Sequence, residues 1–344
     1  MGNISAFLFL LASFGVPILS SEFRKNQTAI FAAWITLAAH HAVAFFNTFI
    51  HPVSQTWGDM YFFHRSAMEG RAGEPYIHIL HFIYSIFGGS FWLGSVLSVF
   101  TFSLTLILLA DSLRLLRRES ALTTAVLILG MLPGPLVHRS VPLRESMQAL
   151  CFAGLLWPII SIHREGPAFK KYAVFIGSFA LLSALHHAMI FFGAIAAFVI
   201  FSYASKSKGS AVNIVILAVT VAGGAAALSR AEFLEKSASV QAYKTGNFLS
   251  YATTYRKFVD SARSSYDAEI DTSDAPSFIV SVTQVEFYYF MAPLPWQVSS
   301  VIDYLAFGEV VTRIVLFLNF LARTSQGNRN SDELVIVLLT FTME

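Results

Sequence analysis

The chain has 344 residues, of which 55% are hydrophobic and only 13% are charged, and its mean hydropathy is +0.61. A soluble domain would carry about a quarter charged residues, so this composition excludes an ordinary soluble protein. The net charge of +2 says little about partners, and the single cysteine, Cys151, excludes an intrachain disulfide. Several apolar runs reach the length of about 20 residues that crosses a bilayer, and the alternating strands of an outer-membrane barrel are missing. We therefore predict an all-α protein, a polytopic transmembrane helical bundle.

The first apolar run covers residues 4–20. No lysine or arginine precedes it, whereas Arg24 and Lys25 follow it. A cleavable signal peptide has the opposite order, with basic residues before its apolar core. We predict an uncleaved span with its N-terminus outside the cytoplasm, followed by a second span over residues 28–50.

An outer loop is expected over residues 51–75. Residues 76–87 are amphipathic and too short to span a membrane, and Gly88 and Gly89 end this segment. The third span covers residues 91–112 and precedes the basic residues of the next cytoplasmic turn.

The fourth span, residues 121–137, ends in a stretch rich in proline, and the fifth covers residues 143–162. The apolar segment 172–204 follows and is interrupted by His186 and His187. A single helix of this length would be about 50 Å long, more than a bilayer requires. Two short spans with the histidine pair at the outer turn fit better, and one long tilted helix is the alternative.

The remaining pattern predicts a span over residues 211–228 and a long hydrophilic outer loop over residues 229–277. Residues 278–297 either span the membrane or form a re-entrant or interfacial segment, and the span 301–322 then runs inward. The final apolar residues, 334–342, are too few to cross a bilayer, so the chain is expected to end within a span. These segments make about nine spans in one transmembrane domain, residues 1–344.

The distribution of basic residues supports this topology. Cytoplasmic loops carry an excess of lysine and arginine. The predicted outer short loops hold four such residues, Arg65, Arg71, Arg139 and Arg144. The predicted inner loops hold twelve: Arg24, Lys25, Arg114, Arg117, Arg118, Arg164, Lys170, Lys171, Lys206, Lys208, Arg323 and Arg329.

The stretch 133–146 places charged residues at the membrane edge, where each ionisable group is costly and needs a reason. Arg139 and Arg144 suit phosphate binding, because the guanidinium fork matches phosphate oxygens; contact with lipid headgroups is the alternative. Arg144 opens a helix, whose N–H groups also favour an anion. Glu145 is either its ion-pair partner or a general base. Arg230, at the start of the long outer loop, is a further candidate for phosphate binding.

Other ionisable residues have both a chemical and a structural interpretation. Asp59 is a candidate general base or ligand of sugar hydroxyls, or else a solvated loop residue or helix cap. His187 is a candidate base or proton shuttle, although a histidine pair at a turn also has structural uses. Glu309 and Arg313 are four residues apart and are expected to form an intrahelical ion pair. We predict no metal site and no cofactor, since neither a zinc-ligand spacing nor a glycine-rich nucleotide loop is present.

Three short motifs, in this order, resemble a family of bacterial membrane proteins. The first is an aspartate close to a tyrosine and a histidine in an outer loop, as in Asp59, Tyr61 and His64. The second is Leu-Pro followed after a short stretch by a basic and an acidic residue, as in Leu132-Pro133 and Arg144-Glu145.

The third motif is a Pro-Phe-Pro-Trp-Glu-like signature before a late span with a glutamate. Residues 293–297 and Glu309 resemble it, although Gln297 replaces the usual glutamate. Together the motifs cover most of residues 50–313. They are similar to those of the repeat-unit polymerases of O-antigen and capsule, and more distantly of glycosyltransferases that use lipid-linked sugars.

This resemblance implies a hexosyltransferase-type enzyme of the bacterial inner membrane. It would transfer a glycan from undecaprenyl diphosphate to a lipid-linked acceptor on the periplasmic side, in the synthesis of surface polysaccharide. Asp59, Glu145 and His187 are the expected catalytic residues, and Arg139, Arg144, Arg230, His64 and Trp296 the expected substrate-binding residues. The expected partners are lipid-linked oligosaccharide, membrane lipid and other polysaccharide export proteins, with no nucleic acid.

Two other functions fit the same sequence. One is a transporter or flippase for a lipid-linked or anionic substrate, although transporters often show internal repeats and helices broken at mid-membrane. The other is a non-catalytic partner in a glycan assembly complex.

Overall fold

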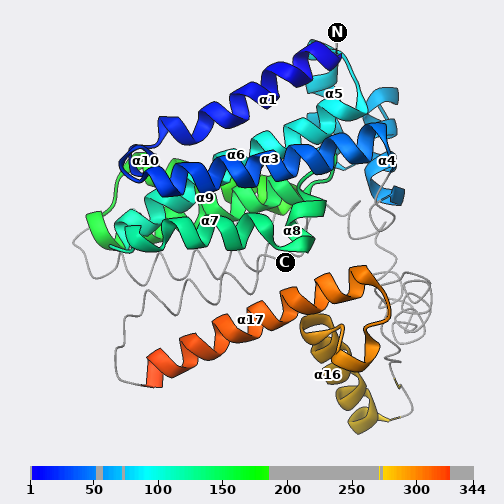
Figure 1. The fold of residues 1–344 in the computed structure, drawn as a ribbon, viewed down its shortest axis with the longest axis vertical. Helices are drawn as coiled ribbons and strands as arrows, with labels where there is room; N and C mark the ends of the chain where they lie inside the picture. The colour runs from blue at the N-terminus through cyan, green and yellow to red at the C-terminus, as the bar shows by residue number, and fades with distance from the viewer. Residues whose placement is uncertain (1, 52–56, 72–73, 186–270, 272–273, 326–344) are drawn as a thin grey trace. The chain divides into compact units, whose positions relative to one another are not determined.

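The computed structural model describes residues 2–51, 57–71, 74–185, 271 and 274–325. The chain divides into two compact units, residues 1–221 with 342–344, and residues 222–341. Within the described residues every regular element is helical and none is a strand, which confirms the all-α prediction (Figure 1).

Four of the described helices are long and apolar enough to cross a membrane. They are α1 (Gly2–Leu19), α3 (Gln27–Phe49), α6 (Phe91–Leu115) and α9 (Glu145–Glu165). They correspond to the first, second, third and fifth predicted spans and fit a membrane protein. The larger predicted number of spans stays a prediction.

Short elements separate these helices. They are α2 (Ser21–Lys25), α4 (Trp57–Glu69), α5 (Pro75–Phe87), a 3-10 turn η1 (Glu119–Ala121), α7 (Leu122–Met131), α8 (Pro133–His138) and α10 (Phe169–Leu185). The prediction that residues 76–87 form a short helix ended by glycine is confirmed. Gly88 has φ +82°, a backbone conformation that glycine adopts without a steric penalty.

Local capping fixes where two of the long helices begin. The Asn26 Oδ1 accepts a hydrogen bond of 3.0 Å from the Ala29 N–H at the start of α3. The Ser90 Oγ accepts one of 3.0 Å from the Leu93 N–H at the start of α6. Each cap satisfies an N–H group that has no partner within its helix.

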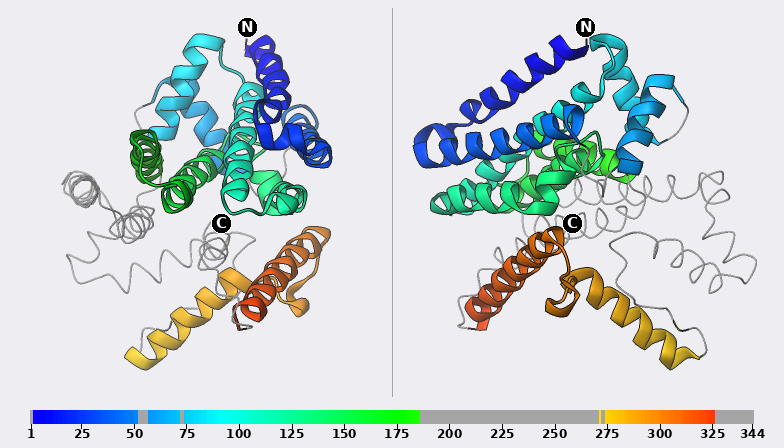
Figure 2. Two further views of the ribbon diagram at one scale, coloured as in Figure 1. Left: turned by 90° about the vertical axis from the view of Figure 1, so that its left-hand side faces the viewer. Right: turned by 45° about the vertical axis from the view of Figure 1, so that its right-hand side comes forward.

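Helix α6 occupies the centre of the first unit and packs against α1, α3 and α9 (Figures 1 and 2). Its side chains Phe102 and Leu106 are fully buried. Small residues allow close approach elsewhere: a side chain on Gly130 of α7 would collide with Thr36 of α3. Close packing of this kind holds helices together in lipid, where apolar burial supplies little net driving force.

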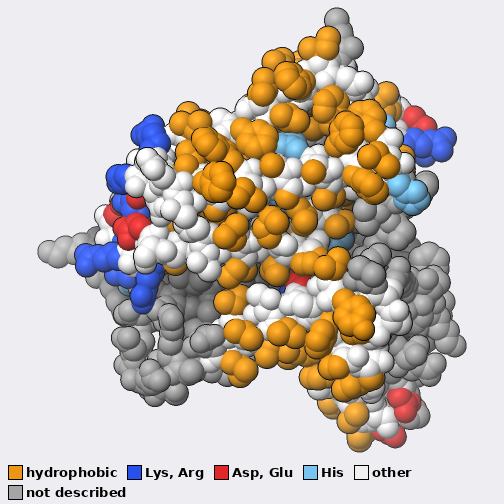
Figure 3. Space-filling view, viewed as in Figure 1, with side chains coloured by type: hydrophobic (Ala, Val, Ile, Leu, Met, Phe, Trp, Pro, Cys, Tyr) orange, Lys and Arg blue, Asp and Glu red, His pale blue; other side chains and the backbone are white. Residues whose placement is uncertain are grey.

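Two ends of this unit carry most of its charges (Figure 3). We call residues 20–26, 111–122 and 163–171 the basic end, because eight basic and four acidic side chains lie there. We call residues 57–91 and 132–146 the proline end, where the described residues include four basic and four acidic side chains.

The second unit contains α16 (Ala275–Met291), a 3-10 turn η2 (Pro295–Gln297) and α17 (Val301–Ser325). The Asp274 Oδ1 accepts a hydrogen bond of 2.7 Å from the Ser277 N–H and caps α16. The Asp303 Oδ2 accepts one of 2.8 Å from the Ser300 N–H at the start of α17. Residues 278–297 are thus a helix that ends at Met291, followed by a turn.

Candidate functional site

The break between α7 and α8 organises the proline end. Helix α7 ends at Met131, earlier than the predicted span limit at residue 137, and Leu132 is extended. Pro133 has no N–H group, so it cannot donate to the Leu129 carbonyl as the next residue of a helix would. A break at this position leaves carbonyl groups without helical donors inside the bundle, where they need other partners.

Two side chains supply the missing donors. The Arg139 Nη1 donates to the Leu129 carbonyl at 3.1 Å, and the His40 Nε2 donates to the Gly130 carbonyl at 3.0 Å. The His40 Nδ1 also forms a hydrogen bond of 3.0 Å with the Ser140 Oγ. His40 therefore has a structural role at the helix break.

Arg139 points into the bundle. Its side chain is buried, with 4% of its surface exposed, and its guanidinium lies 5.1 Å from the centre of the Phe102 ring. The guanidinium is thus engaged within the bundle, where it stabilises the helix break. Phosphate binding by Arg139 stays a prediction.

Arg144 lies at the N-cap of α9, as the sequence predicted for a residue that opens this helix. Its Nη1 donates to the Glu74 Oε2 at 2.7 Å and to the Leu185 carbonyl at 3.4 Å. Arg144 therefore pairs with a carboxylate 70 positions away rather than with its neighbour Glu145. About a quarter of its side chain, 26%, remains exposed.

Glu145 is the centre of the candidate site. Its Oε2 atom is buried and has no hydrogen-bond partner among the described residues. Asp59 of α4, His138 of α8 and Arg144 lie close enough to interact electrostatically with its carboxyl group. Tyr76 of α5 is a further electrostatic neighbour. The fold thus brings together two predicted catalytic residues, Asp59 and Glu145, and one predicted substrate-binding residue, Arg144.

Gln148 follows one turn after Glu145 on α9. Its Nε2 atom is also buried, without a hydrogen-bond partner in the part of the chain that the structure describes. Burying a polar group without a partner costs about 1–3 kcal/mol, so two such groups on one helical turn require an explanation. We did not select Gln148 from the sequence, although its spacing of three residues from Glu145 places both on one helix face.

His64 is held by aromatic neighbours at the same end. A hydrogen bond of 3.0 Å joins its Nδ1 to the Tyr84 Oη, and its ring packs edge-on against Phe91. Partial burial lowers the pKa of His64 from its ordinary value, because the imidazolium form loses hydration.

The remaining predicted site residues are Trp296, His187 and Arg230. Trp296 is in η2 of the second unit and is 77% exposed. His187 and Arg230 lie outside the described residues. The predicted intrahelical ion pair is confirmed, since the Arg313 Nη2 donates to the Glu309 Oε1 within α17.

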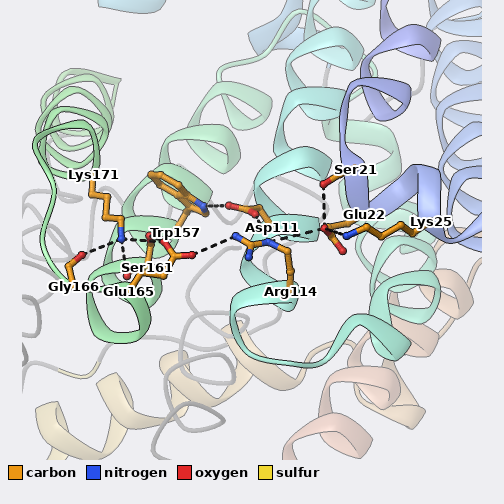
Figure 4. Close-up of polar contacts among 10 residues, drawn as sticks. All are labelled: Ser21, Glu22, Lys25, Asp111, Arg114, Trp157, Ser161, Glu165, Gly166 and Lys171. Atoms are coloured by element: carbon orange, nitrogen blue, oxygen red, sulfur yellow. Dashed lines mark hydrogen bonds and ion pairs between the residues drawn. The ribbon is translucent and has the colours of Figure 1, made fainter.

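The basic end contains a second polar cluster (Figure 4). Arg114 lies between three carboxylates, at 2.8 Å from Asp111, 3.6 Å from Glu165 and 4.0 Å from Glu22. The Lys171 Nζ donates to the Glu165 Oε2 at 3.1 Å and to two backbone carbonyls. These contacts connect α2, α6, α9 and α10, so the cluster holds the helix ends together. It also places basic residues from three predicted cytoplasmic turns at one end of the unit.

A hollow of about 440 Å³ opens beside this cluster. It is lined by Glu22, Lys25, Asn26, Gln27, Glu119, Ser120 and Leu122. Its lining contains both signs of charge and no aromatic side chain, so it shows no preference for an anion.

Comparison of the chain with protein-family models, curated proteins and solved structures found no match.

Proposed function

We propose that this protein is a membrane glycosyltransferase that acts on lipid-linked sugars, as a repeat-unit polymerase of bacterial surface polysaccharide. One observation carries the proposal: Asp59 and Arg144, from distant parts of the sequence, lie within electrostatic reach of the partly buried Glu145. A base beside a cation is the minimum that such a transfer needs when the donor already has a diphosphate leaving group.

The chemistry assigns a role to each charge. Glu145 or Asp59 takes the proton from the acceptor hydroxyl as its oxygen forms a bond to the anomeric carbon of the donor. The bond between this carbon and the diphosphate oxygen breaks, and the diphosphate leaves with the electron pair. Arg144, partly exposed and at the N-terminus of α9, neutralises the developing charge.

The contact between Arg144 and Glu74 is compatible with diphosphate binding by Arg144. The pair measures 2.7 Å, and both side chains are partly exposed, at 26% and 46%. An ion pair with this exposure contributes only about 0–1 kcal/mol, so a diphosphate can compete for the guanidinium at little cost.

The experiment is deletion of the gene followed by separation of surface glycans on a gel. The proposal expects single repeat units to remain and long chains to disappear. Loss of all surface glycan would contradict it and favour a flippase, and an unchanged profile would favour a non-catalytic partner.

Complementation with variants then tests the site. Glu145→Gln and Arg144→Ala should each fail to restore long chains while the protein accumulates normally. Glu69→Gln is the matched control, because Glu69 lies on α4 with Asp59 but forms ion pairs with Arg65 and Arg71. Long chains in both site variants would overturn the assignment.

A further inference from the structure

The basic end has more positive charge than its carboxylates neutralise. Of its four acidic residues, Glu22, Asp111 and Glu165 are all bound by Arg114, and Lys25 and Lys171 add further ion pairs. The network therefore pairs three of the four carboxylates at this end with cations (Figure 4).

Three exposed cations lie outside this network. Arg24, Arg117 and Lys170 have no carboxylate partner within the residues that the structure describes. Arg24 makes only a 3.4 Å contact with the Ile18 carbonyl, and Lys170 lies 5.8 Å from the centre of the Trp157 ring. All three are available to an external anion.

The backbone of Arg117 is unusual. Its φ of +58° lies in the left-handed region, just after the end of α6, where glycine is the residue usually found. Arginine has a steric penalty in this conformation that glycine does not have. An exposed charged side chain at a position that favours glycine suggests that the charge itself has a use.

Exposed apolar side chains lie beside these cations. Leu19, at the end of α1 before Arg24, is 73% exposed, and Phe169, next to Lys170, is 88% exposed. In the space-filling view apolar side chains cover much of the helices, and lysines and arginines gather at one end of them (Figure 3). A lipid has a matching arrangement, with apolar acyl chains next to a charged headgroup.

We propose that the basic end binds the phosphate groups of anionic lipids through Arg24, Arg117 and Lys170, with Leu19 and Phe169 among the acyl chains. Juxtamembrane cations attract anionic headgroups in this way. The hollow at the same end does not suit a free phosphate, because Glu22 and Glu119 line it. This inference is independent of the proposed enzymatic function.

The test uses the full-length chain, purified in detergent, and measures the binding of fluorescent phosphatidylglycerol by titration. Phosphatidylethanolamine, which has no net charge, is the comparison lipid. The expected result is preferential binding of phosphatidylglycerol that weakens as salt is raised, because the contacts are exposed. Equal binding of the two lipids, or binding that does not change with salt, would overturn the proposal.

Variants locate the contact. Replacing Arg24 and Lys170 by glutamine and Arg117 by glycine should weaken phosphatidylglycerol binding about fivefold for each cation removed. The control is Arg65→Gln with Arg71→Gln, which removes exposed cations from the proline end, where both pair with Glu69. Equal weakening in the control would overturn the assignment to the basic end.

Arg117→Gly alone separates lipid binding from folding. Glycine suits the backbone at φ +58°, so this variant should unfold at the same temperature as the wild type or higher while it binds phosphatidylglycerol more weakly. Unchanged affinity would overturn the role of Arg117. Displacement of the lipid by inorganic phosphate, beyond the effect of chloride at equal ionic strength, would indicate a free-anion site and would also contradict the proposal.

Discussion

The two ends of the first unit differ in whether their buried polar groups have partners. At the basic end, Glu22 is almost fully buried, with 8% of its side chain exposed, and two cations bind it. At the proline end, Glu145 and Gln148 each bury a polar atom that no group of the described residues binds. The paired groups of the basic end have a structural role, because their ion pairs connect the helix ends. Two buried atoms without a partner indicate a group that the described residues do not supply, such as water or substrate.

The largest effect should come from breaking the satisfied network. Arg114→Met removes the cation shared by three carboxylates and leaves Glu22, Asp111 and Glu165 with fewer partners. Loss of one partner of a buried ion pair costs several kcal/mol, but Arg114 is 37% exposed, so we expect about 2 kcal/mol.

The single cysteine supplies the measurement. Cys151 in α9 is buried, with 3% exposed, so a thiol-reactive fluorophore reports its exposure as purified protein unfolds on heating. Arg65→Met at the proline end is the control, because its pair with Glu69 is exposed to solvent and should contribute little to stability. If both variants unfold at the same temperature, the basic-end network has no special structural role.

At the proline end, substitution of Gln148 should change stability in the opposite direction. Gln148→Met removes a buried amide nitrogen that has no partner among the described residues, and it keeps a side chain of similar length. We expect the stability to stay the same or to rise by up to about 1 kcal/mol, because no hydrogen bond is lost. The same thermal measurement applies.

Ser146→Ala is the matched change on the same helical turn. The Ser146 Oγ donates to the Arg139 carbonyl at 3.4 Å, so this variant should be slightly less stable than the wild type. A marked loss of stability in Gln148→Met would show that the amide has a partner in the folded protein and would remove the contrast between the two ends.

The sequence was sufficient for features that depend on neighbouring residues. The apolar runs predicted the four long helices, Gly88 predicted the end of α5, and the four-residue spacing predicted the ion pair of Glu309 with Arg313. Helical geometry alone determines these features.

Features that depend on packing between distant segments could not be predicted from the sequence. Nothing near Arg144 indicates that its partner is Glu74, and nothing near Arg139 indicates that it points inward to the carbonyl of Leu129. The choice of partner depends on which helix faces the residue after folding. For the same reason, the sequence offered an ion pair of Arg144 with Glu145 as one alternative, whereas in the fold Arg144 pairs with Glu74.

The smallest effect concerns His64 at the proline end. Burial lowers the pKa of His64 in the folded protein below its ordinary value of about 6.5. The unfolded chain therefore binds a proton there more readily than the folded chain does, and stability falls as the pH drops through this ordinary value. For a partly buried histidine we expect a loss of less than about 1 kcal/mol.

Comparison of unfolding temperatures at about pH 7.5 and about pH 5.5 measures this loss. His64→Gln should have a smaller decrease than the wild type, because glutamine does not titrate and other buried histidines affect both proteins equally. His78→Gln, which changes an exposed histidine of α5, should keep the wild-type decrease. An equal decrease in His64→Gln and the wild type would mean that His64 is hydrated in the folded protein. The proline end would then be open to water, and water would be the simplest partner for Glu145 and Gln148.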